Sequence, residues 1–284
     1  MLLFFHYYAN AQNEPELFPG NDRKEGALGY FLKDGTKVIK GQFCSASYNI
    51  DGYYIVSLAE HEVDSYGNKK ERHIPNTEKF GLLNGKGQFI INFKENYNSI
   101  YVKNGIIQVG KNNLYGIVND KNEIVVPVQF EELEIKNQSA IIAKLNSKAG
   151  IINKENKIVI PFIYDEIDNF VENRASFNFL ISVKKDNKIA IINQSNKIVV
   201  PFSNNKFQFI TENSICIIKD NKFRLVDYNL KSLIPMKFNI MYTINEKPEN
   251  KIYAENKNYG YYFTNNGTLL KKEKLINPVK LIIQ

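Results

Sequence analysis

The sequence is poor in the residue types from which catalytic and metal-binding sites are commonly built. Its 284 residues include no tryptophan, three histidines, two cysteines and four arginines. There is no Gly-rich phosphate-binding loop and no Gly-x-Ser-x-Gly motif. Cys44 and Cys216 stand in no CxxC or other metal-binding spacing, and beside no plausible histidine partner. These absences predict a protein that is not an enzyme and that holds no metal or other cofactor.

The positive charge of the chain is spread along the sequence rather than concentrated. The formal net charge is +7, and the excess is mostly lysine that occurs singly or in short pairs such as Lys69-Lys70. Nucleic-acid binding usually needs a basic face rich in arginine. We therefore expect a solvated surface of lysine and asparagine, and no nucleic-acid partner.

Long apolar runs are also lacking. No segment approaches the roughly 18 apolar residues that a membrane-spanning helix requires. The chain starts with a short apolar stretch, residues 2–8, followed by Ala9-Asn10-Ala11, which has the small-x-small form of a signal-peptidase site. We interpret residues 1–11 as a signal-peptide remnant, which predicts a periplasmic or extracellular protein. The alternative is an ordinary N-terminal strand and a cytoplasmic protein.

The two cysteines lie far apart in the sequence. Cys216 falls inside the apolar run 215–218, which predicts a buried free thiol. The alternative, in an oxidising compartment, is a single disulfide between Cys216 and Cys44.

The sequence does contain an internal repeat. Four segments align without gaps over twelve residues, and their closing prolines are separated by 34, 40 and 34 residues. The segments are 116–127, 150–161, 190–201 and 224–235. Looser copies are anchored at Gly29, Gly81 and Gly260. Residues 12–284 are therefore predicted to form a single domain of about seven units with a period near 35 residues.

Each unit carries the pattern of a specific β-hairpin. Asn or Asp stands three positions after the anchor in five units: Asn84, Asn119, Asn153, Asn193 and Asp227. Gly or Asn stands six positions after it: Gly35, Gly87, Asn122, Asn156 and Asn196. This spacing predicts a type I turn closed by a residue in the left-handed region, which Gly and Asn adopt most easily. Leu230 breaks the pattern, which predicts a different turn in the sixth unit.

The flanking strands complete the predicted unit. The return strand is a continuous apolar run, as in residues 158–160, which predicts burial on both faces, and the proline after it is expected to end the strand. A further apolar strand, such as residues 140–143, precedes each anchor. The predicted fold is all-β, with tandem three-stranded antiparallel meanders in an open curved array. A closed β-propeller is the alternative.

The repeat resembles the bacterial WG-repeat family. The resemblance rests on residues 148–161, KAGIINKENKIVIP, on the following 164–167, YDEI, and on 170–175, FVENRA. It extends over about 29–270 and is strong from 114 to 236. The signature tryptophan is never present, because its positions hold Leu28, Phe80, Tyr115, Ala149, Ile189, Phe223 and Tyr259. The signature glycine is replaced by Ala190 and Arg224 in two units. The resemblance implies a β-repeat array and brings no catalytic residues.

The interval between Gly29 and Gly81 is longer than the period, which predicts an insertion near residues 44–78. We expect it to form a projecting hairpin that brings His61 and His73 close together. The candidate binding residues are Tyr53, Tyr54, His61, Tyr66 and His73. The alternatives are an edge cap over the first unit, a metal site and an enzymatic site in the same segment.

These observations predict a non-catalytic repeat scaffold that binds another protein in the bacterial envelope or outside the cell. The competing hypothesis is a glycan-binding module, because tyrosine rings stack on sugars and asparagine offers both donors and acceptors.

Overall fold

A computed structural model describes residues 15–66, 69–74, 76–173, 178–211, 214–227, 229–245 and 250–275. The predicted signal-peptide remnant at residues 1–11 lies outside this part of the chain. The chain divides into two compact units, one of residues 1–146 and 152–157 and the other of residues 147–151 and 158–284. Each is described by itself below. The only helical element in the described residues is the short 3-10 turn Phe93–Glu95.

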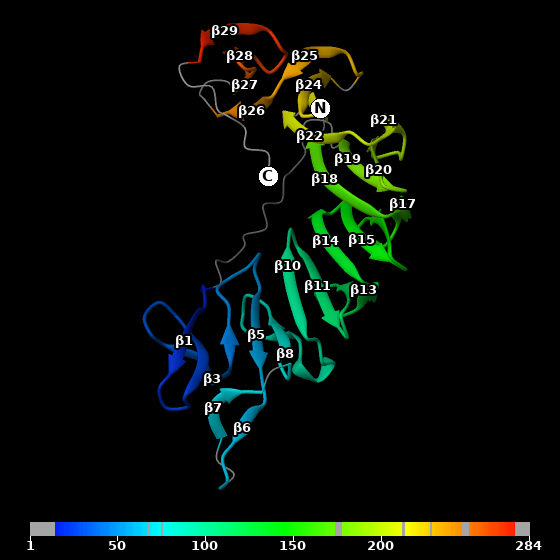
Figure 1. Cartoon of the computed structure of the whole chain (residues 1–284). Helices are drawn as coiled ribbons and strands as arrows, with labels where there is room; N and C mark the ends of the chain where they lie inside the picture. The colour runs from blue at the N-terminus through cyan, green and yellow to red at the C-terminus, as the bar shows by residue number, and fades with distance from the viewer. Residues whose placement is uncertain are drawn as a thin grey trace, which may run out of the picture. The chain divides into compact units, whose positions relative to one another are not determined.

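The strands form successive antiparallel sheets, each built from neighbouring segments of the sequence (Figure 1). The first three sheets are β1(Phe18–Asp22)-β2(Ala27–Phe31)-β3(Lys37–Phe43), β4(Ser45–Ala46)-β5(Tyr54–Leu58)-β8(Lys79–Leu83)-β9(Phe89–Ile91) and β10(Ser99–Lys103)-β11(Ile106–Lys111)-β12(Leu114–Val118)-β13(Ile124–Phe130). The next two are β14(Glu132–Asn137)-β15(Ala140–Leu145)-β16(Lys148–Ile152)-β17(Ile158–Tyr164) and β18(Glu166–Asn173)-β19(Asn178–Lys185)-β20(Lys188–Asn193)-β21(Ile198–Ser203). The last two are β22(Lys206–Thr211)-β23(Ser214–Lys219)-β24(Lys222–Asp227)-β25(Ser232–Phe238) and β26(Ile240–Ile244)-β27(Lys251–Glu255)-β28(Tyr259–Phe263)-β29(Leu269–Lys274). The predicted all-β repeat fold is confirmed.

Each regular unit has four strands, so the prediction of three was wrong. The missed strand is the first one of each sheet, such as β14, in which exposed Glu132 and Glu134 alternate with buried Leu133 and Ile135. This alternation is typical of a strand with one solvated face, whereas the prediction followed continuous apolar runs. Among the described residues, only the first sheet has three strands.

The return strand lies at the edge of its sheet and is buried on one face only, contrary to the prediction. In β13, Val125 is 37% exposed whereas the adjacent Val126, on the opposite face, is fully buried. Pro127 lies inside this strand instead of ending it, next to an irregularity in the pairing of β12 with β13. An edge strand tolerates proline because one of its sides needs no hydrogen-bond donor.

The predicted hairpin turns are confirmed. In the third sheet the N–H of Asn122 donates to the carbonyl of Asn119, and Asn119 Oδ1 accepts from the N–H groups of Lys121 and Glu123. The turn residues have positive φ in every predicted case: Gly35 86°, Gly87 76°, Asn122 63°, Asn156 62° and Asn196 58°. In the last sheet Gly267 is the residue with positive φ (85°) that closes the turn. The anchor of this unit, six positions earlier, is therefore Tyr261 and not the predicted Gly260.

Leu230 makes the same turn, so the prediction for the sixth unit was wrong. Its φ is 63°, its N–H donates to the carbonyl of Asp227, and Asp227 Oδ1 accepts from Asn229 and Lys231. The left-handed conformation costs a non-glycine residue about 1–2 kcal/mol. The Leu230 side chain compensates by packing against the cluster that contains Val226 and Val200.

We expect Leu230→Gly to be more stable than Leu230→Ala by about 1 kcal/mol, because both lose the leucine contacts and only glycine relieves the left-handed strain. Urea denaturation measures the difference. The control is the neighbouring Lys231, which lies outside the left-handed region. There the alanine variant should be the more stable one. If glycine is the less stable residue at both positions, the strain argument is wrong.

Consecutive sheets within one compact unit pack on one another through apolar faces. In the second compact unit, one buried cluster joins Cys216, Leu225, Ile234 and Phe238 of β23–β25 to side chains of the following sheet: Met241, Ile252, Ala254 and Phe263. In the first unit, Tyr30 and Phe43 of the first sheet pack in the same way against Tyr54, Val56 and Leu83 of the second. These joints between consecutive sheets supply the core.

The predicted insertion is shorter than expected. Residues 45–46 and 54–58 are β4 and β5, which pair within the second four-stranded sheet. Of the strands in the described part of the chain, only the two-stranded hairpin β6(His61–Val63)-β7(Lys69–His73) stands outside the regular sheets, between β5 and β8 (Figure 1).

Candidate functional site

The β6–β7 hairpin is the main departure from the repeat. His61 and His73 are directly opposite one another in its Cα register. Its base is closed by the N–H of Ile74, which donates to the carbonyl of Glu60 (2.7 Å), and by the N–H of Glu60, which donates to Thr77 Oγ1 (3.0 Å). Residues 59–66, 74 and 76–78, whose burial the structure describes, are all half-buried or exposed. The strand β6 and the base of the hairpin therefore contribute no fully buried side chain to the core.

Tyr66 lies in the turn of this hairpin and is 89% exposed. Its N–H donates to Asp64 Oδ1 (2.9 Å), so the backbone of the turn is held by a local hydrogen bond. An exposed tyrosine offers a large amphipathic contact surface with few rotatable bonds.

The structure separates the other two predicted tyrosines from this surface. Tyr54 is 1% exposed, its hydroxyl accepts a hydrogen bond from the N–H of Leu17 (2.9 Å), and its ring packs edge-on against Tyr30. Tyr53 is half-buried against the cluster of Leu82 and its neighbours, and burial raises the pKa of its hydroxyl. Tyr54 is a core residue and is not available to a partner. The expectation that it projects from the insertion was wrong.

Cys44 lies next to a histidine that the sequence analysis did not associate with it. Its Sγ is 4.0 Å from Nε2 of His61. The two residues are 17 positions apart, and no short motif signals the proximity, because the fold of β4 and β5 creates it. Within the part of the chain that the structure describes, no group of three His, Cys, Asp or Glu side chains is placed to hold a metal ion.

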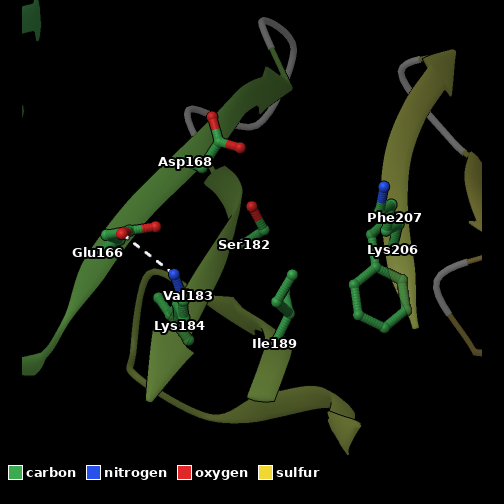
Figure 2. A pocket seen from close by; sticks show the side chains of 8 residues that line it. All are labelled: Glu166, Asp168, Ser182, Val183, Lys184, Ile189, Lys206 and Phe207. Carbon is green, nitrogen blue, oxygen red and sulfur yellow. Dashed lines mark hydrogen bonds and ion pairs between the residues drawn. The ribbon is translucent and has the colours of Figure 1, made fainter. Parts of the chain in front are cut away.

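A second candidate is a pocket of about 250 Å³ in the second unit (Figure 2). One wall comes from β18, β19 and β20, and the other comes from β22 of the next sheet. The lining side chains are Glu166, Asp168, Ser182, Val183, Lys184, Ile189, Lys206 and Phe207. The pocket combines both signs of charge with an apolar wall, which is typical of a site for a small polar molecule.

Two of the charged groups at this pocket form an ion pair that has an equivalent in the preceding sheet. Glu166 pairs with Lys184 (3.1 Å), and the equivalent Glu132 pairs with Lys144 (3.0 Å). Next to Glu166, Asp165 accepts from Lys148 Nζ (2.6 Å), and this hydrogen bond is the main reason that the pKa of Asp165 is lowered. Glu166 and Glu132 thus pair with a lysine of the adjacent strand, and Asp165 pairs with Lys148.

Two buried ionisable groups have structural roles. Asp22 is 3% exposed and accepts from the N–H of Gly41 (3.0 Å) and from Lys37 Nζ (2.6 Å), which together lower its pKa to about 2. Burial raises the pKa of Cys216 to about 12, and its Sγ lies 3.9 Å from Met241 Sδ. Both cysteines are free thiols, so the prediction of a buried free thiol at Cys216 is confirmed.

Comparison with known protein families supports the resemblance seen in the sequence. The family model described as "WG containing repeat" matches residues 115–148 and 150–188, which are two adjacent repeats. No curated protein matches the sequence. No helix in the described residues is long and apolar enough to cross a membrane.

Solved structures show only a distant likeness. Kluyveromyces lactis Hsv2 is 9% identical with a TM-score of 0.38, over 87% of this chain and 93% of that chain. A crystal structure of the eukaryotic initiation factor is 10% identical with a TM-score of 0.38, over 93% and 89% of the two chains. The extracellular domain of a putative one-component system from B. thetaiotaomicron is 11% identical with a TM-score of 0.33, over 85% and 39%. The fold of this chain is defined by the pairing of its own strands.

Proposed function

We propose that this chain, two of whose units are WG containing repeats, is a non-catalytic scaffold that binds another protein through the β6–β7 hairpin. The observation that carries the proposal is the contrast between the regular sheets and this hairpin. The apolar side chains of the sheets are used in the joints between them, whereas β6 and the base of the hairpin contribute no fully buried side chain and the turn exposes Tyr66. Binding residues are found disproportionately on exposed segments that a rigid scaffold positions, which makes the hairpin the candidate binding element.

The compartment that we propose is the bacterial envelope or the exterior. The support is the apolar stretch followed by Ala9-Asn10-Ala11 at the start of the chain. N-terminal sequencing of the mature protein tests it. A chain that begins at Gln12 agrees with export, and an intact Met1 in a cytosolic fraction contradicts it.

Replacing residues 59–78 by Asn-Gly is expected to abolish partner capture while the melting temperature changes by only a few degrees. Leu58 and Lys79 are already Cα partners in the β5–β8 ladder, so a two-residue turn can join them directly. The measurement is affinity capture from an envelope extract of the native cell, together with a thermal melt of each variant.

A pair of point variants narrows the test to the aromatic side chain. Tyr66→Ala should reduce capture, whereas Tyr48→Ala should not, although Tyr48 is 67% exposed and lies between β4 and β5 of the sheet from which the hairpin departs. If removal of the hairpin lowers the melting temperature strongly and causes aggregation, the hairpin is an edge cap and the binding proposal is wrong.

A further inference from the structure

The last sheet presents a row of tyrosines on one face. Tyr242 of β26 is opposite Tyr253 of β27, which is opposite Tyr262 of β28, which is opposite Lys271 of β29. Directly opposite residues place their side chains on the same face of a sheet. The ring centroids are 5.1 Å apart for Tyr242 and Tyr253 and 5.2 Å apart for Tyr253 and Tyr262. The three rings therefore form a continuous aromatic surface.

The equivalent face of the preceding sheet is an apolar joint. The turns at Leu230 and Gly267 align the two sheets, so that Cys216, Leu225 and Ile234 correspond to Tyr253, Tyr262 and Lys271. Those three residues are fully buried under the last sheet. Tyrosine and lysine at the same places in the last sheet do not suit a further apolar joint, either with another repeat or with a second copy of this chain.

Hydrogen bonds hold polar groups at defined places beside the tyrosines. Tyr253 donates to Glu255 Oε2 (2.9 Å), and Tyr262 donates to Glu273 Oε1 (2.8 Å). Lys271 Nζ contacts Glu273 Oε2 (2.6 Å) and lies 5.4 Å from the centre of the Tyr262 ring. These contacts fix the carboxylates and the rings relative to one another before any ligand arrives, which lowers the entropic cost of binding.

A glycine opposite both carboxylates makes room for the central ring. Gly260 is the Cα partner of Glu255 and of Glu273. A Cβ at this position would lie 2.6 Å from the Tyr253 hydroxyl, so any larger residue would displace the ring. Tyr253 is 8% exposed and forms the base of the surface, while Tyr242 is 47% exposed and forms its accessible edge.

We propose that this face of the last sheet binds an uncharged glycan. Aromatic rings pack against the C–H faces of sugar rings, and the carboxylates accept hydrogen bonds from sugar hydroxyls. Lys271 and Glu273 already neutralise one another, and Glu255 accepts the hydrogen bond of Tyr253, so the face offers hydrogen-bond acceptors for hydroxyl groups instead of a cluster of charges of one sign. The proposal does not depend on the β6–β7 hairpin, so it and the proposed protein partner can fail independently.

Titration calorimetry of the full chain with cellohexaose, chitohexaose and maltohexaose tests the proposal. At least one of the three should bind, and Tyr242→Ala should weaken that binding about tenfold, as expected for the loss of roughly 1.4 kcal/mol of aromatic contact. Tyr242→Phe keeps the ring and should retain most of the affinity. The matched control is Tyr101→Ala, because Tyr101 is the equivalent residue of β10, is 51% exposed and is opposite Gln108 instead of a tyrosine.

The outcomes are distinct. Binding that is lost in Tyr242→Ala and kept in Tyr101→Ala, in Tyr242→Phe and in the hairpin-replacement variant supports the glycan site. Absence of binding to all three hexasaccharides overturns it, and so does an equal loss in Tyr242→Ala and Tyr101→Ala. Binding of hexalysine in place of the sugars also overturns it, because the face would then recognise a cationic peptide.

Discussion

Phe238→Ala is expected to lower the free energy of unfolding by about 3–5 kcal/mol. Phe238 is fully buried at the end of β25 and is opposite Phe223 in the adjacent strand. Its ring also meets two rings of the following sheet edge-on, Tyr261 at 5.0 Å and Phe263 at 5.8 Å. The substitution leaves a cavity in the joint between two sheets, which packed neighbours fill only partly. Urea denaturation of the full chain measures the loss.

The control for Phe238→Ala is Ile158→Ala in β17, which belongs to the same compact unit. Ile158 is 65% exposed, so its removal should change the free energy of unfolding by no more than about 0.5 kcal/mol. If both faces of the return strand were buried, as its continuous apolar run predicted, Ile158→Ala and Phe238→Ala would lower the free energy of unfolding by similar amounts. Comparable losses in the two variants would contradict the edge-strand description.

Deletion of residues 116–149 is expected to yield a folded protein that is one unit shorter. The deletion joins Tyr115 to Gly150, which takes the place of the equivalent Gly116, and therefore keeps the alternation of strands and the spacing of the turns. The calorimetric enthalpy of unfolding should fall by roughly 24 kcal/mol, which is 34 residues at about 0.7 kcal/mol each, and the transition should stay cooperative. Scanning calorimetry measures both quantities.

The same deletion tests the arrangement of the sheets, which stays a prediction. In an open array each unit depends only on its neighbours, so the loss of one is tolerated. A deletion variant that unfolds or aggregates would instead indicate a closed ring in which every sheet is needed.

Several features of the fold could be predicted because they are local in the sequence. The Asn119 turn depends on contacts within four residues, and the conformation of Asn122 follows from the few residue types that adopt positive φ. The failure at Leu230 has a tertiary cause. The packing of its side chain against a neighbouring cluster stabilises a conformation that the residue type alone disfavours.

The candidate sites were predicted less completely. The spacing of the anchors located the insertion, and His61 and His73 were correctly expected to meet across a hairpin. The proximity of Cys44 to His61 and the burial of Tyr54 could not be predicted, because they depend on which segments join the second sheet. The tyrosine row of the last sheet was missed because cross-strand register brings together residues that are 9–11 positions apart in the sequence.

The sequence by itself determined the all-β class, the period, the turns and the resemblance to WG repeats, because these follow from residue types at short, fixed spacings. The tertiary structure decided which strands are edges, which faces are joints and which aromatic side chains reach solvent. The physical reason is that a side chain on a sheet face is buried only when a second surface packs against that face. The same Val-Ile-rich or Tyr-rich strand becomes core or binding surface according to whether another sheet covers it.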